Sequence, residues 1–401
     1  MSQRPLPALT GVRFFLALWV VIYHHVPPIE SVLASFPALL GACEALLHTG
    51  YSAVTAFFVL SGFVLAYNYD LSRAPTPSST RSFAIARFSR IYPAYAVGLL
   101  LLVPLALYRL SEGIEIAPPA EEWGDFLLNA ALLQAWLPQA ALTWNFPGWS
   151  LSNEAFFYAC FPLLGFWLWR SRHTALLVLV LWGLACAAPL AAVWWPAYHW
   201  GDVPATTLIL PKGMSIWANV VRYNPLLRLP EFCCGILLAK LYFAMPVSHP
   251  LQGRGYWLYL PCTLITLAVL INGTHIPYPL IHNGLLVPLY GGILLGLALG
   301  GGILARFLST SPLLLLGNAS YSLYILHAPT YQWLDIAFRR LLDRDPHGWL
   351  WFFSYLIIII GGACVFYKLI EEPLHRALRS ALTRYFAKPT TTAVYNRVNE
   401  T

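Results

Sequence analysis

The chain has 401 residues, of which 58% are hydrophobic and only 10% are charged. A soluble chain of this length would form two or three domains, but so apolar a composition excludes a set of ordinary soluble domains. The formal net charge of +7 is typical of the cytoplasmic Lys and Arg of a membrane protein, so no nucleic-acid partner is expected. The sequence therefore predicts an all-α, polytopic membrane bundle.

Apolar runs close to the roughly 20 residues that cross a bilayer predict about ten transmembrane helices. The predicted spans cover residues 9–26, 51–69, 91–109, 150–169, 174–195, 224–244, 256–273, 282–305, 312–337 and 348–370. An even number of spans places both termini on the same side. The arginine-rich segment 73–90 identifies that side as the cytoplasm.

A further apolar piece, 124–140, is short and follows the acidic segment 112–125, which is expected outside. Arg170 and Arg172 should lie in the cytoplasm at the end of the next span, so that span begins outside. Residues 124–140 therefore do not cross, and we expect a re-entrant or interfacial helix on the outer side.

Residues 1–375 are predicted to form one membrane core, and residues 376–401 a basic cytoplasmic tail that is partly disordered. The first apolar run is not a cleavable signal, because Arg13 interrupts its start and no small-residue cleavage site follows. The seven cysteines have no metal or redox spacing, so no metal site is expected.

The first span, 9–26, carries ionisable residues where a membrane helix rarely has them: Arg13 near its start and His24 and His25 near its end. At about 100° per residue, Arg13 and His24 fall within about 20° of each other, about 16 Å apart along the axis. Two interpretations remain open. Arg13 snorkels to the headgroups and the histidines are interfacial, or this shared face carries function.

Arg87 and Arg90 have the i,i+3 spacing that places two guanidinium groups on one helical face. Such a pair could bind the phosphates of a donor, or it could be an ordinary cytoplasmic flank. Glu154 is a carboxylate at membrane depth, where burial without a partner is costly. It could orient an imidazole and stabilise its protonated form, or it could belong to a capping box that touches water.

Further polar residues are assigned to substrate binding: Trp149, Ser152, Arg228, Glu231 and His327. Alternatives remain open for most of them. Ser152 could cap the helix, Arg228 and Glu231 could form a purely structural i,i+3 pair, and His327 could pack between helices or act as a second catalytic histidine.

The predicted topology sorts these polar residues by depth. Toward the outer surface lie His24, Glu154, Arg228, Glu231 and His327, and toward the inner surface lie Arg13, Arg87, Arg90, Glu371 and Glu372. A base and a carboxylate at one surface with cations at the other would suit a reaction across a membrane. A transporter or flippase for a lipid-linked sugar would also use intramembrane charges, although no internal repeat supports it.

Several motifs follow one another in a fixed order along nearly the whole chain. They are Leu9-Thr10-Gly11-Val12-Arg13 with His24 following, Phe57-Phe58-Val59-Leu60-Ser61-Gly62-Phe63, Arg87-Phe88-Ser89-Arg90-Ile91-Tyr92-Pro93, Trp149 to Tyr158, Arg228 to Gly235, Gly317 to His327, and Glu371-Glu372-Pro373. Together they resemble acyltransferase family 3, the integral-membrane O-acyltransferases of the O-antigen and exopolysaccharide acetylase type.

The resemblance implies a bacterial inner-membrane enzyme that moves an acyl group, often acetyl, from cytoplasmic acyl-CoA to a hydroxyl of an outward or lipid-linked carbohydrate. By position it makes His24 the catalytic residue, with Arg13 as its essential partner and Glu154 in a characteristic motif. Arg87 and Arg90, with Tyr92 in the same motif, become the CoA contacts. No permanently bound cofactor is implied, and the partners are acyl-CoA, the carbohydrate acceptor and membrane lipids.

One position departs from the family pattern. Thr10 stands where the family often has Asp, which removes an expected hydrogen-bond partner of Arg13.

Overall fold

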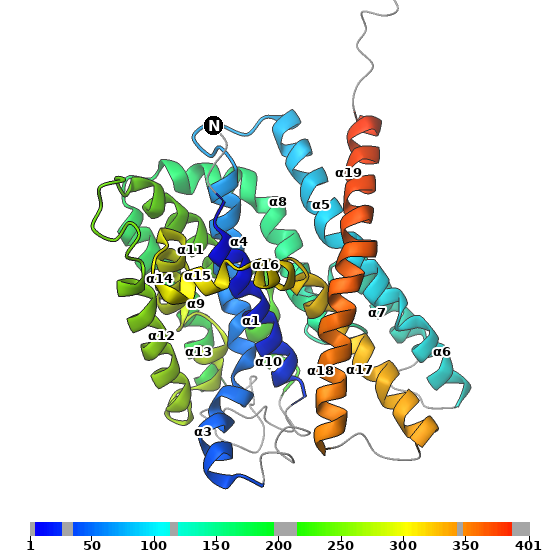
Figure 1. Ribbon diagram of the computed structural model, residues 1–401. Coiled ribbons are helices and arrows are strands. Elements are labelled where there is room, and N and C mark those ends of the chain that lie inside the picture. The colour runs from blue at the N-terminus through cyan, green and yellow to red at the C-terminus, as the bar shows by residue number, and fades with distance from the viewer. Residues whose placement is uncertain (1–4, 26–34, 113–118, 196–214, 343–347, 387–401) are drawn as a thin grey trace, which may run out of the picture.

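The computed structural model describes residues 5–25, 35–112, 119–195, 215–342 and 348–386, and these residues form a bundle of helices (Figure 1). No strand occurs within these ranges, so the all-α prediction is confirmed. In chain order the helices are α1 (Pro7–Tyr23), α3 (Pro37–His48), α4 (Ala53–Asn68), α5 (Pro77–Leu100), α6 (Val103–Ser111), α7 (Pro119–Ala130), α8 (Trp149–Arg170), α9 (Thr174–Trp194), α10 (Ala218–Tyr223), α11 (Pro225–Ala244), α12 (Tyr256–Ile271), α13 (Tyr278–His282), α14 (Val287–Leu299), α15 (Gly302–Leu308), α16 (Ser311–Asn318), α17 (Ser320–Leu342), α18 (Gly348–Phe366) and α19 (Glu372–Phe386).

Membrane character is evident from the length and composition of several helical segments. Five segments are long and apolar enough to cross a bilayer: Gly50–Asn68, Pro77–Ser111, Thr174–Trp194, Tyr278–Leu299 and Leu350–Phe386. Two shorter apolar helices, α1 and α12, accompany them. These helices therefore have the length and composition expected of a multi-pass membrane protein.

Two predicted continuous spans are broken. The predicted span 282–305 divides at Gly300 and Gly301, whose φ angles of 76° and 88° end α14 and start α15. Glycine adopts this left-handed backbone without the steric cost of a side chain. The predicted span 312–337 divides between α16 and α17 at Ala319.

The piece predicted as a re-entrant or interfacial helix, 124–140, holds the second half of α7 and irregular backbone after it. At 12 residues, α7 is too short to cross a bilayer. From Ala131 the chain continues through turns and two short 3₁₀ helices to Gly148. Leu132 and Trp144, with φ angles of 58° and 53°, hold left-handed backbone that non-glycine residues seldom adopt.

The C-terminal basic helix exists, but it continues the line of α18 (Figure 1). A π-helical turn, Tyr367–Glu371, joins α18 to α19, and Pro373 lies in the first turn of α19, where its missing N–H is not needed. The predicted boundary between residues 375 and 376 therefore falls inside a helix. Of the tail 376–401 that was predicted to be partly disordered, residues 387–401 lie outside the described residues.

Helix α1 lies at the centre of the bundle, packed against α4 and α14 to α17 (Figure 1). Beside it, α4 and α11 cross at Gly62 and Gly235. A Cβ on Gly62 would lie 2.0 Å from the carbonyl oxygen of Phe232, and one on Gly235 would lie 2.0 Å from that of Val59. The crossing therefore requires glycine on both helices, because any side chain would hold their backbones apart.

Candidate active site

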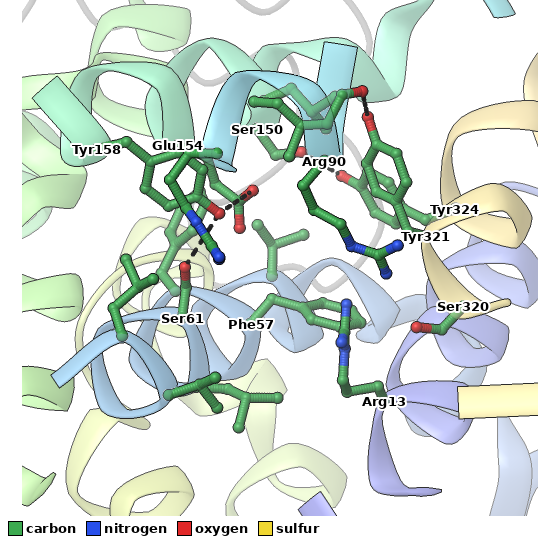
Figure 2. A pocket seen from close by; sticks show the side chains of 18 residues that line it. Arg13, Phe57, Ser61, Arg90, Ser150, Glu154, Tyr158, Ser320, Tyr321 and Tyr324 are labelled. Atoms are coloured by element: carbon green, nitrogen blue, oxygen red, sulfur yellow. Dashed lines mark hydrogen bonds between the residues drawn. The ribbon is translucent and has the colours of Figure 1, made fainter. Parts of the chain in front are cut away.

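A cavity of about 150 Å³ lies among α1, α4, α5, α8 and α17, and Figure 2 shows the side chains around it. Its polar lining consists of Arg13, Ser61, Arg87, Arg90, Ser150, Glu154, Tyr158, Ser320, Tyr321 and Tyr324. The remaining lining residues are apolar. The structure therefore brings together the arginines of the first and third predicted spans, as expected.

The three arginines differ in how far they are neutralised. Arg90 donates from Nη1 to Oε1 of Glu371 at 2.7 Å, and Ser322 donates to the other carboxylate oxygen. Arg87 lies over the ring of Tyr69 at 5.7 Å, without an ion pair in the described part of the chain. Arg13 has neither a hydrogen bond nor an ion pair within that part, in keeping with Thr10 where the family often has Asp. The lining holds three arginines against Glu154 and the Glu371 partner of Arg90, which leaves a net positive charge for an anionic ligand.

Glu154 lies in this cavity, and not beside the imidazole where the sequence-based topology placed it. Its Oε2 accepts a hydrogen bond from the hydroxyl of Tyr158 at 2.9 Å, and that hydroxyl lies 3.5 Å from Ser61 Oγ. The difference arises because the 3₁₀ turn Phe146–Gly148 already sits inside the bundle, against the rings of the histidine pair. The first turns of α8 are consequently deep, at the level of the arginines.

The partner of His24 is His327. Nδ1 of His24 lies 3.0 Å from Nε2 of His327, and the two ring planes are within 14° of parallel. His24 caps the C-terminus of α1, whereas His327 lies on α17, and 303 positions separate them. Arg13 and His24 thus both face α17, Arg13 near Ser320 in the cavity and His24 at His327. Their spacing predicted the shared face, but not that α17 lies against it.

The hydrogen bonds fix the tautomers of the two neutral rings. Nδ1 of His327 lies 2.6 Å from the carbonyl oxygen of Tyr324, which can only accept, so this nitrogen carries the proton. Nε2 of His327 is then an acceptor, and Nδ1 of His24 donates to it. Nε2 of His24 is left with a lone pair and no hydrogen-bond partner among the described residues. That nitrogen can act as a base or as a nucleophile.

Tyr324 lies between the cavity and the histidine pair. Its hydroxyl lies 2.9 Å from Ser150 Oγ at the cavity wall, and its carbonyl oxygen holds His327. Phe146 packs against both histidines, and the centroid of its ring lies 4.7 Å from that of His24 and 5.7 Å from that of His327. The cavity and the histidine pair are therefore neighbours across one tyrosine.

The neighbouring His25 has a different environment. It is buried, its Nδ1 donates to the carbonyl oxygen of Val21, and its ring packs on Tyr331 and Tyr355. These contacts within the protein explain why the His25 ring is buried, and no ligand needs to be invoked.

Arg228 and Glu231 form a closed cluster away from the cavity. Arg228 Nη2 lies 3.1 Å from Oε2 of Glu231, with both side chains fully buried. Arg228 also donates to the hydroxyl of Thr55 and to the carbonyl oxygen of His282, and Glu231 accepts from the backbone N–H of Gly284. This geometry corresponds to the structural alternative for the pair, and its assignment to substrate binding stays a prediction.

Three other predicted contacts are engaged within the protein. Tyr92 donates from its hydroxyl to the carbonyl oxygen of Ala130, and Ser152 Oγ donates to that of Leu132. Trp149 is buried against Tyr223. These side chains do not line the cavity. They secure the irregular segment before α8 to its neighbours.

Comparison with known proteins bears on this arrangement. The model of a family described as an acyltransferase domain matches residues 6–368, nearly the whole chain. The chain belongs to acyltransferase family 3. Its cation-lined cavity and histidine pair are the candidate parts of an active site.

Individual relatives agree with the family. The chain is 33% identical over 244 residues to an acyltransferase, MdmB, of Streptomyces mycarofaciens, an alignment covering 59% of this chain and 57% of that protein. It is 25% identical over 397 residues to the peptidoglycan O-acetyltransferase OatA of Listeria monocytogenes, covering 94% of this chain and 56% of that protein. It is 22% identical over 416 residues to YrhL of Bacillus subtilis, named a putative peptidoglycan O-acetyltransferase, covering 96% and 57%. The chain thus spans little more than half the length of these relatives, and no solved structure matches it.

Sequence reasoning missed Tyr324 and Phe146. Tyr324 stands three residues before His327 in a quoted motif, where helical spacing puts its carbonyl oxygen beside that histidine's ring. Phe146 belongs to irregular backbone, and no periodicity indicates its place.

Proposed function

We propose that this enzyme moves an acyl group, in particular acetyl, from cytoplasmic acyl-CoA to a hydroxyl of an extracytoplasmic or lipid-linked carbohydrate. It would do so in the bacterial inner membrane, with about ten spans and both termini in the cytoplasm. The acceptor class is supported by the relatives named as peptidoglycan O-acetyltransferases. The observation that carries the proposal is one unbonded imidazole nitrogen and one arginine-lined cavity on the same helix, α1.

The arginines suit the donor. CoA carries a diphosphate and a further phosphate, and guanidinium groups bind phosphate oxygens with paired hydrogen bonds. The arm between the diphosphate and the sulfur has about a dozen bonds, comparable to four residues of extended backbone or about 14 Å. Arg13 and His24 are about 16 Å apart along α1. Because Arg13 lines the same cavity as Arg87 and Arg90, phosphates held there would direct the thioester arm along α1 toward His24.

His24 supplies the chemistry at the other end of that arm. As a general base, its Nε2 takes the proton of the acceptor hydroxyl while the hydroxyl oxygen attacks the thioester carbonyl. The C–S bond breaks, and the proton passes from His24 to the departing thiolate. Alternatively, the Nε2 lone pair attacks the thioester carbonyl, the C–S bond breaks and CoA leaves as the thiolate. The acceptor hydroxyl oxygen then attacks the acyl group on Nε2, the C–N bond breaks, and the hydroxyl proton passes to the thiolate. In both routes His327 holds Nδ1–H of His24, so Nε2 keeps its lone pair toward the substrate.

The donor site is tested with purified protein in lipid nanodiscs. Arg87→Ala combined with Arg90→Ala should raise the KM for acetyl-CoA about tenfold or more, since each loses a charge-assisted hydrogen bond to phosphate. The KM for the acceptor should stay within about twofold. Arg81→Ala is the matched control, because Arg81 is exposed on the same helix outside the cavity. An unchanged dependence on acetyl-CoA would remove the arginine pair from the donor site.

A further inference from the structure

A second cavity, of about 340 Å³, lies at the far end of the α5–α6 segment from Arg87. Arg87 is near the start of that segment and Arg109 near its end, about 33 Å away along a helical path. The lining residues are Leu102, Ala106, Arg109, Glu122, Asp125, Leu142, Thr143, Trp144 and Gln332. This volume lies in the range of small-molecule sites, and the cationic cavity does not share any of its lining.

The polar groups of this second cavity have spare hydrogen-bonding capacity. Glu122 and Asp125 have no ion-pair partner among the residues that the structure describes. Burial, with the charge of Glu121 added to it, raises the pKa of Asp125, so hydrogen-bond donors brought to that carboxylate would stabilise its charge. Arg109 donates from Nη2 to Oε1 of Gln332 at 2.8 Å, and both side chains retain further N–H groups that can donate to a ligand.

Trp144 forms a flat apolar wall between these polar groups. Its indole N–H donates to the carbonyl oxygen of Glu122 at 2.9 Å, and its ring packs 5.6 Å from Trp123 and 4.8 Å from Phe126. Its φ angle of 53° is costly for an aromatic residue and is maintained by these contacts. The backbone strain therefore occurs at the residue, Trp144, whose ring lines the second cavity.

The strained segment also reaches the histidine pair. Trp144 stands two residues before Phe146, whose ring contacts both His24 and His327. Asn145 between them donates to the carbonyl oxygen of Ile325 on α17, at 3.1 Å. A ligand in the second cavity would therefore lie one short, anchored segment away from the reacting nitrogen.

We propose that the second cavity binds an uncharged or amino-bearing sugar unit of the acceptor, adjacent to the unit that is acylated at His24. This inference rests on the proposed function. Sugar hydroxyls donate to the carboxylates of Glu122 and Asp125 and accept from Arg109, while the C–H face of the ring packs on the indole of Trp144. The two carboxylates repel acidic sugars and phosphate groups, so an anionic unit is disfavoured here.

The test compares acceptor and donor kinetics in the full-length protein in nanodiscs, with acetyl-CoA and the cell-surface glycan fraction of the producing bacterium. Asp125→Asn, which keeps the shape of the side chain, and Trp144→Ala should each raise the acceptor KM about tenfold, or about 1.4 kcal/mol. The KM for acetyl-CoA and its slow hydrolysis without acceptor should stay within about twofold. Glu121→Gln on α7 and Trp333→Ala on α17 are matched controls outside the lining.

A second readout does not need turnover. Carbodiimide labelling of carboxylates, mapped by mass spectrometry, should show that the glycan fraction protects Glu122 and Asp125 but not Glu121, and that acetyl-CoA protects none of them. Transfer without protection, or an acceptor KM unchanged in both variants, overturns the second cavity as a sugar site. Protection without any transfer by the wild-type protein refutes the proposed function and leaves the sugar site standing.

Discussion

Two of the polar clusters in the described part of the bundle differ in whether they leave a reactive atom without a partner. In the cluster of Arg228 and Glu231, the two terminal guanidinium nitrogens and the carboxylate meet partners from the protein, and both side chains are fully buried. In the histidine pair, the chain of hydrogen bonds from Tyr324 through His327 ends at His24, whose Nε2 is left over. The first arrangement neutralises itself, whereas the second presents a reactive atom.

This difference gives a physical criterion for intramembrane polar residues. Burying charge is tolerated when partners compensate it, so a compensated pair with both side chains fully buried is evidence for packing and not for chemistry. Arg90 differs from such a pair, because it is bonded to Glu371 but remains partly exposed. An uncompensated group at the same depth costs stability and persists where function requires it. By this criterion we assign Arg13, Arg87 and His24 to the proposed reaction and the pair of Arg228 and Glu231 to the scaffold, and variants of His24 and Arg228 test these assignments.

The largest expected effect is that of His24→Ala. Loss of the nitrogen that takes the hydroxyl proton in the proposed reaction should lower acetyl transfer about 10²- to 10⁴-fold. CoA release measures this directly, and thermal unfolding in detergent should change little. His25→Phe is the control, because His25 packs among aromatic rings and its loss should reduce stability without a comparable loss of turnover. Near-normal acylation by His24→Ala would place His24 with the scaffold.

The self-neutralised cluster should respond in the opposite way. Arg228→Met leaves Glu231 buried without its cation and should lower the free energy of unfolding by about 3–5 kcal/mol. Adding Glu231→Leu should recover most of that loss, since apolar residues of similar volume replace a buried ion pair at little cost. Chemical denaturation followed by far-UV circular dichroism measures both variants. A double variant that folds but transfers no acetyl group would show that the pair acts in the reaction.

A smaller effect is expected for His327→Phe, which removes the acceptor for Nδ1–H of His24. Losing one hydrogen bond to a ring that becomes charged costs about 1.5–3 kcal/mol, or roughly 10- to 150-fold in turnover. His327→Gln offers a carbonyl oxygen in its place and should restore part of the rate. The acidic limb of the pH profile should shift to lower pH in His327→Phe, because the imidazolium form of His24 loses its stabilising acceptor and gives up its proton more readily. An unchanged profile and no recovery in His327→Gln would make His327 a packing residue.

The helical fold and the shared faces of the charged residues follow from patterns within single segments of the sequence. Apolar runs and their charged flanks predicted an all-helical membrane protein, and the i,i+3 spacing of Arg87 and Arg90 predicted their shared face. The eleven-residue spacing of Arg13 and His24 likewise predicted that they share one face of their helix. These features depend on helical geometry within one segment, which the sequence carries directly.

The remainder depends on contacts between distant segments. The position of Glu154 follows from the irregular chain before α8. There Leu132 and Trp144 adopt a left-handed backbone conformation, which is rare for leucine and tryptophan and so could not be predicted from the sequence. The pairing of His24 with His327 joins two helices 303 positions apart. Whether Arg228 is compensated depends on Thr55 and His282, which other helices supply. Tertiary packing determines these three features, and the periodicity of hydrophobic residues within one segment does not predict such packing.

The smallest expected effect separates two roles for Ser150, which lies at the wall between the cavity and Tyr324. Ser150 Oγ donates to the carbonyl oxygen of Pro147 at 3.0 Å and meets the Tyr324 hydroxyl at 2.9 Å, as a helix-start serine would. Ser150→Ala should therefore lower turnover only about fivefold or less, the cost of one neutral hydrogen bond of about 1 kcal/mol. If Ser150 instead carried the acyl group, the same variant would lose turnover as completely as His24→Ala. Steady-state CoA release from both variants, measured side by side, decides whether the reactive atom on this path is the imidazole nitrogen alone.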